Sequence, residues 1–538
     1  MTIQDLTAEK SADTVLELWG RKWHGRTVAG FGLDTRSLRL SCSADQLKEA
    51  YRWLTEELGY AFATLIAEEF GENAWSFYYV FLGDRDPVCI QLEVNVQGER
   101  PAVPSVVGLA QGPAADWHER EIEDLFGIAF EGHPRLGEFV LHEDWPEGTN
   151  PMRHKFDAHR HIENREPHPT WEPPTIVVSP GAFAMPIGPV FSDFAEASHF
   201  LLETVGEDVI HTIPRFFYKY RGVEKIAEGK SRDHALLLAE RFSGSSAFAH
   251  GLAFCQALET ICGITVPQRA CVLRTIFAEL ERLRHHAAVI TGICNSTALA
   301  VAASQAALIE EDLLRLSCRV ARHRYLFGVV IPGGVRFDIA DTLGDHLCAE
   351  VASQARRLHE LHAMLRYSSS FLDRLEEVGT ISTDQARAYG LVGPVARAAG
   401  VARDIRKLLA YAGYGSADFV IPDEQDGDGY ARLRVLFCEA EQSASIIHQL
   451  WSARSEGPVC AERINARSGA ALGVVEAPAG AASHWLRLAE DGSIARYRIT
   501  PPSFVNWHGF HLAAENFAFQ DFPIILASFG LSNAECDR

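Results

Sequence analysis

Apolar residues in the first part of the chain follow two different periods. Residues 43–70 (SADQLKEAYRWLTEELGYAFATLIAEEF) place them at helical spacing, which predicts a helix. The runs FYYVFLG (77–83) and VCIQLEVNVQG (88–98) alternate and are rich in aromatic and β-branched residues, which predicts strands. Residues 117–128 (WHEREIEDLFGI) indicate an amphipathic helix that ends at Gly127. Residues 1–160 are therefore predicted to form one α+β domain.

Helical periods dominate the chain after residue 176. Two strand-like runs, TIVVS and FLLETVGEDVI, come first. Pro267 marks a helix start, and five apolar residues follow at helical spacing: Leu273, Ile276, Phe277, Leu280 and Leu283. Further helices are predicted at 301–325, 345–377 and 429–451, whereas RYRITPPSF and PIILASFG near the end indicate strand or loop. Residues 176–538 are therefore predicted to form a mainly helical bundle with small β additions, so the fold class is α+β.

Residues 161–175 lie between these two domains. The stretch Glu163–Thr175 (ENREPHPTWEPPT) contains four prolines and few apolar residues. Because X-Pro pairs favour an extended backbone, residues 161–175 are predicted to be a linker.

One uncharged segment, Ala287–Ile309, is long enough to cross a bilayer. It consists mostly of Ala, Gly, Ser and Thr, contains Asn295 and Gln305, and lacks the density of Leu, Ile, Phe and Val that insertion needs. A buried helix is therefore the favoured interpretation. The acidic N-terminus also lacks the basic and then apolar start of a signal peptide, so no export signal is expected.

Charge and cysteine content narrow the function classes. The 538 residues include 50 Lys+Arg and 71 Asp+Glu, a net charge of −21, which argues against nucleic-acid binding because phosphates need a basic face. Eleven scattered cysteines without a CxxC pair predict reduced, structural thiols in the cytoplasm. The chain has no Walker A, HExxH or GxSxG motif, no GxGxxG after a strand, and no cysteine pair with zinc or iron–sulfur spacing. An active site would have to be assembled from dispersed residues.

A histidine-rich and basic cluster precedes the linker. Its members are His154, His159, His161, His168, Arg153, Lys155, Arg160 and Arg165. Histidine is a common metal ligand, but the spacing has no ordered ligand geometry. A solvated or partner-facing basic strip is therefore favoured over a metal site.

Two further groups of ionisable residues allow more than one interpretation. Glu119–Glu121 (ERE) together with Asp124 could act as an acid/base pair, although a solvated helix face is favoured. For His285 and His286, a surface histidine beside one satisfied core histidine is favoured over a proton relay.

A polar stripe adjoins the apolar face of the helix that starts after Pro267. Glu279, Arg282 and His286 occupy positions i, i+3 and i+7 of this stripe. Glu279 and Arg282 are expected to form a buried helix-to-helix ion pair rather than a catalytic dyad.

Several segments taken together resemble a known family. HEREIEDLFGIAFEGHP (118–134) and NPMRHK (150–155) resemble the 30-kDa peripheral-arm subunit of complex I, the NADH:quinone oxidoreductase. Later segments resemble, in the family's order, the complex I 49-kDa subunit and the large subunits of [NiFe] hydrogenases: PIGPV (186–190), YRGVEK (220–225), GITVPQRACVLRTIFAELERLRHH (263–286), VGPVARAAGVARDIRK (392–407), DGYARLRVLFCEAEQS (428–443), EAPAG (476–480) and RYRITPPSF (496–504). The fusion in one chain is the arrangement of membrane-bound group 4 hydrogenase and formate hydrogenlyase large subunits. The resemblance implies a 30-kDa-type α+β domain and then a 49-kDa/hydrogenase-type helical domain.

The [NiFe] ligand positions of that family are changed in this chain. The family's CGIC segment corresponds to FSGSSAFAH, which places Ser243 and Ser246 where two thiolates would stand. The C-terminal DPCxxC corresponds to GLSNAECDR, which places Ser532 and Glu535 at the other two, with Cys536 one residue out of register. Soft thiolates hold nickel and bridge it to iron, so the resemblance implies no Ni–Fe centre and no hydrogen chemistry. The arginine of the family's APRG segment is likewise replaced, by Ala479.

The quinone contacts of the complex I 49-kDa subunit are changed as well. The family's headgroup tyrosine falls on Gly244, and GPVFS (188–192) stands in place of GPQHP, which removes the histidine. The ending AECDR resembles the complex I ending GEVDR more than a processed hydrogenase tail. The resemblance therefore implies a third type, with hydrogenase-related architecture but neither the metal ligands nor the standard quinone contacts.

The resemblance also implies which residues matter and what surrounds the chain. Ser243, Ser246, His250, Glu535 and Asp537 are expected to cluster at the former metal position, where His250 either passes protons or is a buried, satisfied histidine. Coupling residues are expected among Glu279, Arg282 and His286, and interface residues among Arg120, Glu121 and Asp124.

The implied setting is an assembly on the cytoplasmic side of the cell membrane. The chain would be a peripheral-arm large subunit without a directly bound cofactor or metal, docked on an iron–sulfur small subunit and on membrane-embedded ion-translocating subunits. It would line a cavity for a quinone-like acceptor, with NAD at most elsewhere in the complex. The alternative is a non-catalytic scaffold that transmits conformational change to an ion-translocating module; an open polar slot would favour the first and a cavity filled by Phe242 and Phe248 the second.

Overall fold

The computed structural model describes residues 11–23, 29–32, 36–71, 73–84, 86–158, 161–163, 165–166, 180–190, 196–462 and 467–538, with the backbone alone for 29–32. These residues form two compact units. Unit 1 comprises residues 1–174 together with Arg387–Gly390. Unit 2 comprises residues 175–386 and 391–538. Most of the linker, the TIVVS run, His159, Arg160 and His168 lie outside the described residues.

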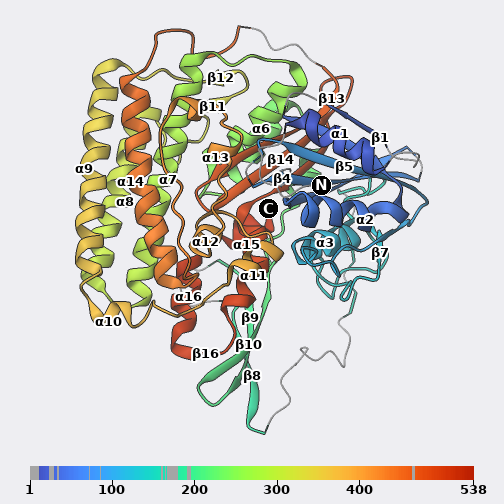
Figure 1. Ribbon diagram of the computed structural model, residues 1–538, viewed down its shortest axis with the longest axis horizontal. Helices are drawn as coiled ribbons and strands as arrows, with labels where there is room; N and C mark the ends of the chain where they lie inside the picture. Colours follow the sequence, from blue (N-terminus) through green and yellow to red (C-terminus); the bar gives the residue numbers. More distant parts are fainter. Residues whose placement is uncertain are drawn as a thin grey trace. The chain divides into compact units, whose positions relative to one another are not determined.

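Unit 1 is built on a five-stranded sheet with the order β1-β2-β5-β4-β3. The strands are β1 (Ala29–Gly32), β2 (Ser37–Cys42), β3 (Tyr60–Phe70), β4 (Ala74–Gly83) and β5 (Cys89–Gln97), and only the β2–β5 pair among them is parallel. The helices are α1 (Ala12–Lys22), α2 (Leu47–Arg52), which continues as a π-helical turn (Trp53–Glu57), and α3 (Asp116–Phe126). A short parallel pair, β6 (Ala102–Pro104) and β7 (Ala129–Glu131), completes the unit (Figure 1).

The predicted helix over residues 43–70 is correct only in its first half. Residues 60–70 instead form β3, which pairs with β4 along its whole length. Gly59, directly after Leu58, adopts a φ of +77°. This left-handed conformation ends a helix, and glycine adopts it with little strain because it has no Cβ atom. The strands predicted in FYYVFLG and VCIQLEVNVQG are confirmed as β4 and β5, and the helix ended by Gly127 is confirmed as α3.

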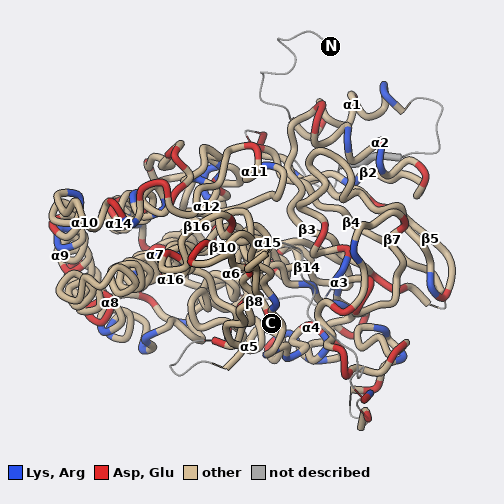
Figure 2. The backbone as a smooth tube through the Cα atoms, turned by 90° about the horizontal axis from the view of Figure 1, so that it is seen from below, with Lys and Arg blue, Asp and Glu red and all other residues tan. Residues whose placement is uncertain are grey.

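Four long helices of unit 2 pack side by side: α7 (Gln268–Ser296), α8 (Ala300–Ala321), α9 (Asp341–Leu365) and α14 (Gly429–Ser452). α7 and α9 each contact both α8 and α14, which makes a closed four-helix arrangement (Figure 1). Asp341 lies in the first turn of α9, where an acidic side chain suits the helix dipole. Acidic residues (red) and basic residues (blue) both occur along the elements of this unit (Figure 2).

Two sheets and further helices adjoin the bundle. One sheet has the order β16-β10-β9-β8, from β8 (Ala182–Ile187), β9 (His199–Val205), β10 (Asp208–Arg215) and β16 (Phe517–Ala518). The other is the meander β13 (Gly469–Ala477), β14 (Gly480–Leu488) and β15 (Ile494–Thr500), with a separate short pair β11 (Val330–Ile331) and β12 (Gly334–Val335). The shorter helices are α4 (Val223–Ala227), α5 (Arg232–Arg241), α6 (Ala247–Cys262), α10 (Ser369–Leu372), α11 (Thr383–Ala388), α12 (Gly393–Ala398), α13 (Ile405–Leu408), α15 (Pro502–Ala513), α16 (Phe522–Phe529) and α17 (Asn533–Asp537).

Helix α6 lies directly on the meander. Gly473 of β13 allows this approach, because a Cβ atom there would stand 2.0 Å from the carbonyl oxygen of Ala253 on α6. A single core runs from α6 through the four long helices to the meander, and includes Leu252, Ile276, Leu433 and Leu486. This packing brings α6, α7, α14 and the β13–β14 edge together, which positions the residues of the candidate site.

The chain around Ala287–Ile309 is not one helix. α7 ends at Ser296 and α8 begins at Ala300. Within the described ranges, no helix is long and apolar enough to cross a membrane.

Near the C-terminus the prediction of strand or loop is partly wrong. RYRIT belongs to β15, but PPSF opens α15 and PIILASF lies in α16. Both helices carry proline in the first turn, where a backbone N–H would have no intrahelical acceptor and its absence therefore costs no hydrogen bond. Gly530 ends α16 in the left-handed conformation.

Candidate functional site

The acidic and basic residues of α3 are buried inside unit 1. Glu119, Arg120 and Glu121 are at most 8% exposed, so the solvated-face interpretation is wrong. Glu119 Oε1 accepts a hydrogen bond from the backbone N–H of Val106 at 2.9 Å, yet burial raises the pKa of Glu119 to about 7. These side chains therefore help to organise unit 1 itself, and a contact with a partner subunit stays a prediction.

Asp124 holds the chain that follows α3. Its Oδ2 accepts hydrogen bonds from the backbone N–H groups of Phe139, Val140 and Leu141, at 3.3, 2.8 and 2.7 Å. Burial raises the pKa of Asp124 to about 6, although these three donors oppose the shift.

The basic strip before the linker is anchored in part. The Arg153 guanidinium donates to the carbonyls of Phe126 and Glu99, at 2.7 and 2.6 Å, and lies over the ring of Trp75. His154 is exposed, and its backbone N–H donates to Glu69. Among the described residues, no group of three or more histidine, cysteine or acidic side chains could hold a metal ion.

Four of the five residues expected at the former metal position come together in unit 2. Glu535 Oε1 lies 3.0 Å from His250 Nε2 and 3.3 Å from Ser243 Oγ. Burial would raise the pKa of Glu535, but His250 and then the neighbouring Ser503 and Ser246 outweigh it and lower the pKa. All four side chains are at most 1% exposed. The expected cluster therefore forms from serine, histidine and glutamate.

Asp537, which was expected in this cluster, and Ser532, which stands at one of the family's ligand positions, point elsewhere. Asp537 accepts from the backbone N–H groups of Phe217 and Lys219, each at 2.8 Å, so it supports the chain before α4 and does not join the cluster. Ser532 Oγ donates to both carboxylate oxygens of Glu196 at 3.0 Å, although it also accepts from the Glu535 N–H as the N-cap of α17.

Helix α7 fixes the segment that carries the two serines. Glu281 accepts from the N–H groups of Phe248 and Ala249 in the first turn of α6, at 2.8 and 2.9 Å. Three residues further along α7, Arg284 Nη2 donates to the Ser245 carbonyl at 2.6 Å. The carboxylate satisfies otherwise unpaired donors at the helix start, although burial raises the pKa of Glu281 to about 7.

Sequence reasoning missed two residues that extend this cluster. His484 Nε2 lies 2.9 Å from His250 Nδ1, and His484 Nδ1 lies 2.6 Å from the Tyr497 hydroxyl. They lie on β14 and β15, in strands that read simply as buried. The only local signal is a histidine beside the apolar Trp485 and Leu486, and nothing around it indicates a partner more than 200 residues earlier.

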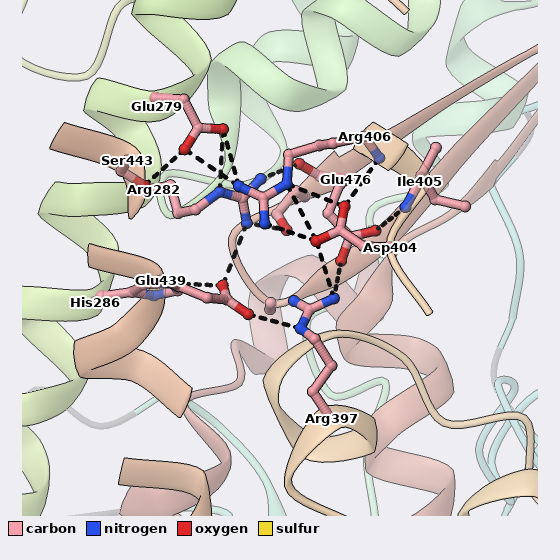
Figure 3. A network of polar contacts seen from close by, with 12 residues as sticks. Glu279, Arg282, His286, Arg397, Asp404, Ile405, Arg406, Glu439, Ser443 and Glu476 are labelled. Atoms are coloured by element: carbon pink, nitrogen blue, oxygen red, sulfur yellow. Dashed lines mark hydrogen bonds and ion pairs between the residues drawn. The ribbon is translucent and has the colours of Figure 1, made fainter. Parts of the chain in front are cut away.

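The polar stripe of α7 enters a buried charge network (Figure 3). Glu279 accepts from Arg282 Nε at 3.3 Å, which confirms a buried ion pair, but one within α7 rather than between helices. It also accepts from Arg406 Nη1 of α13 at 3.2 Å. The Tyr414 hydroxyl and Ser443 Oγ also donate to it, at 2.5 and 2.6 Å. Burial would raise the pKa of Glu279, but Arg282 and Arg406 outweigh it and lower the pKa, so Glu279 is ionised.

Glu439 of α14 links the stripe to α12. His286 Nε2 lies 2.9 Å from Glu439 Oε2, and Arg397 Nε donates to Glu439 Oε1 at 2.6 Å (Figure 3). Burial, as the largest cause, lowers the pKa of His286 in spite of Glu439. His285 is also buried, and burial lowers its pKa, so the prediction of a surface histidine is wrong.

Arg397 continues the network to β13 and α13. Its Nη1 donates to Glu476 Oε1 at 2.9 Å, and Glu476 Oε2 accepts from the Ile405 N–H at 3.0 Å. Asp404 Oδ2 accepts a hydrogen bond from Arg406 Nη2 at 2.6 Å. The network holds four carboxylates (Glu279, Asp404, Glu439 and Glu476) and three guanidiniums (Arg282, Arg397 and Arg406), which leaves one excess negative charge when all are ionised and the histidine is neutral. Burial and then Asp404 raise the pKa of Glu476, so this carboxylate is the one best placed to hold a proton.

The fold and these residues define the class of the protein. The chain belongs to the family in which a 30-kDa-type complex I domain is fused to a 49-kDa/hydrogenase-type domain. Residues 40–161 match the respiratory-chain NADH dehydrogenase 30 Kd subunit, residues 306–467 and 459–538 match the 49 Kd subunit, and residues 221–290 match the nickel-dependent hydrogenase family.

Several relatives cover most of the chain. Formate hydrogenlyase subunit 5 of Escherichia coli K12 is 30% identical over 475 residues, 86% of this chain and 82% of the relative. Hydrogenase-4 component G of the same organism is 28% identical over 471 residues, 86% of this chain and 81% of the relative. The C/D subunit of the NADH-quinone oxidoreductase of Bdellovibrio bacteriovorus is 27% identical over 503 residues, 87% of this chain and 88% of the relative. The chain is thus a complex I-like large subunit.

Proposed function

We propose that the chain is the large peripheral-arm subunit of a membrane-associated respiratory assembly and performs no nickel–iron chemistry. Its relatives include a formate hydrogenlyase subunit, a hydrogenase component and an NADH-quinone oxidoreductase subunit, which supports the oxidoreductase setting. In that setting the chain docks on an iron–sulfur small subunit and on ion-translocating membrane subunits, lines a cavity for a quinone-like acceptor, and uses Glu279, Arg282 and His286 in coupling.

One observation supports the loss of nickel–iron chemistry. At the former metal position, Ser243 and His250 already hydrogen-bond to Glu535, and the third corresponding serine, Ser532, is engaged with Glu196. Neutral hydroxyls and one carboxylate are hard oxygen donors, whereas nickel and an iron bridged to it need soft thiolates. The residues present do not fit the [NiFe] group.

The test uses the assembly purified from native membranes. Iron should be present in the complex, nickel should be absent at stoichiometric level, and the complex should reduce a soluble quinone analogue without taking up or releasing hydrogen. Stoichiometric nickel, together with infrared bands of iron-bound carbon monoxide or cyanide, would overturn the proposal.

A scaffold that transmits conformational change is the second candidate. The ring of Phe242 packs against His250 with 4.5 Å between centroids, and Phe248 is fully buried, so aromatic side chains occupy the surroundings of the former metal position. The two candidates differ in the effect of Glu279→Gln in the assembled complex. If the chain is a catalytic subunit and Glu279 acts in coupling, Glu279→Gln should lower the number of protons translocated per electron. If the chain is only a scaffold, the assembly should reduce no quinone even with Glu279 in place.

A further inference from the structure

Six polar side chains of unit 2 form one continuous hydrogen-bonded chain that is separate from the charge network. In order they are Ser245, Ser243, Glu535, His250, His484 and Tyr497. The successive heavy-atom distances are 3.0, 3.3, 3.0, 2.9 and 2.6 Å. Every link joins a hydroxyl, a carboxylate or an imidazole, which are groups that can both accept and release a proton.

The chain has one end toward solvent and one end inside the protein. Ser245 is half-buried, and the neighbouring Gly244 is exposed with open space where a side chain would stand. The inner members, from Ser243 to Tyr497, are all at most 1% exposed. Within the described residues, the Tyr497 hydroxyl has His484 as its hydrogen-bond partner.

The ionised carboxylate fixes the direction of the inner hydrogen bonds. Glu535 as an anion can only accept, so His250 Nε2 carries the proton between them, and a neutral His250 must then accept at Nδ1. His484 therefore donates from Nε2 and accepts the Tyr497 hydroxyl proton at Nδ1. Burial, as the largest cause, lowers the pKa of His484 well below its ordinary value, which agrees with a neutral imidazole.

One added proton reverses the outer hydrogen bonds without moving a heavy atom. An incoming proton on Ser245 displaces its hydroxyl proton toward Ser243, and the Ser243 hydroxyl proton moves to Glu535 Oε1. The protonated Glu535 then donates to Ser243, and Ser243 donates to Ser245. His250, His484 and Tyr497 keep their hydrogens, so the whole chain has gained a single proton.

We propose that this chain is a proton-loading site, which takes one proton from solvent through Ser245 and Ser243 and stores it on the Glu535 carboxylate. The reaction breaks one O–H bond of hydronium and forms one on the chain, and needs no oxidant or reductant. Ser503 also hydrogen-bonds to Glu535, through its hydroxyl and its backbone N–H, while Glu224 and Cys255 act electrostatically on Tyr497. The site loads its proton in the same way whichever acceptor the assembly reduces, so it goes beyond the proposed function.

Infrared difference spectra of the full chain in its native complex test the storage step. Acidification should produce a protonated-carboxyl band. Glu535→Gln should abolish this band, and Tyr497→Phe should leave it in place. A carboxyl band in Glu535→Gln equal to that of wild type would overturn the proposal, because the proton would then be stored on another group.

A matched pair of variants tests the entry path. Ser243→Thr keeps the hydroxyl, and Ser243→Val has the same shape without it. After a rapid pH jump, the carboxyl band should rise at the wild-type rate in Ser243→Thr and at least tenfold more slowly in Ser243→Val, with the same final amplitude. Equal rates in both variants would show that protons reach Glu535 without Ser243 and would overturn the path; nickel content, which tests the proposed function, is unaffected by either result.

Discussion

Arg397 Nε donates to Glu439 Oε1 at 2.6 Å between two side chains that are both fully buried. Removing water from two charges is costly, and the cost is offset only when each charge keeps its partners. Arg397 also reaches Glu476, and Glu439 also reaches His286, so this pair connects α12, α14, β13 and α7.

Loss of Arg397 is predicted to destabilise unit 2 strongly. Arg397→Met leaves Glu439 buried without its main cation, and the free energy of unfolding should fall by about 3–5 kcal/mol. Arg434→Met is the control, because Arg434 pairs with Glu424 at side chains that are 26% and 30% exposed and should contribute about 1 kcal/mol or less. Denaturant unfolding of the three proteins gives the comparison. Equal losses for the two variants would show that the network does not depend on its buried arginine.

The double variant Arg397→Met/Glu439→Gln separates the pair from its surroundings. Removing the stranded charge should recover part of the stability lost in Arg397→Met, since an uncompensated buried carboxylate is the costly species. Losses that simply add would place the energetic role of Arg397 in its contact with Glu476.

The network also shows how far the sequence alone could lead. The Glu279–Arg282 pair is three residues apart on one helix, so helical periodicity predicts it. Arg406 and Ser443 reach Glu279 from 127 and 164 residues away, and no local pattern indicates such contacts. The resemblance to the family correctly predicted that Ser243, Ser246, His250 and Glu535 lie together. It did not predict that His484 contacts His250, or that Asp537 binds the backbone N–H of Phe217, because both contacts depend on how distant segments pack in the fold.

The error over residues 60–70 has a related cause. YAFATLIAEEF has helical spacing of its apolar residues, yet it is buried along nearly its whole length and pairs with β4. Strand pairing is a non-local interaction, which local periodicity does not register. For this segment, the aromatic and β-branched content was the better signal.

A pH dependence of stability is predicted at Glu119. Its folded pKa of about 7 lies above the ordinary value of 4.5, so between these values the folded state binds more protons than the unfolded state. The contribution to stability is complete below about pH 4.5 and is lost as pH rises through 7, with a total on the order of 3 kcal/mol. Relative to wild type, Glu119→Gln should therefore become more stable as pH rises from 5 to 8. Melting curves of the full chain that shift in parallel for both proteins over this range would contradict the assignment.

Removal of the Asp124 carboxylate is predicted to loosen residues 139–141. Asp124→Ala leaves three backbone N–H groups without their acceptor, and amide hydrogen exchange there should accelerate. Glu123→Ala, which removes one acceptor from Gly137, is the smaller perturbation and serves as the control. Binding to the partner subunits should be measured on the same samples. Weaker binding with unchanged exchange at 139–141 would mean that Asp124 contacts a partner directly, as the family resemblance implies.

Restoring the four thiols is predicted not to restore a metal centre. Ser243→Cys, Ser246→Cys, Ser532→Cys and Glu535→Cys would supply the family's donor types, but residue 532 is turned toward Glu196 rather than toward the other three. Removing Glu535 also deprives His250 Nε2 of its acceptor and Ser503 of its partner, and Ala479 stays where the family has arginine. A metal site depends on such supporting contacts as much as on its ligands. The quadruple variant, made in a host that inserts nickel into its own hydrogenases, should contain no stoichiometric nickel and evolve no hydrogen. Nickel bound at one per chain would show that donor identity alone decides the site, and that the contacts of Ser532 and Glu535 rearrange freely.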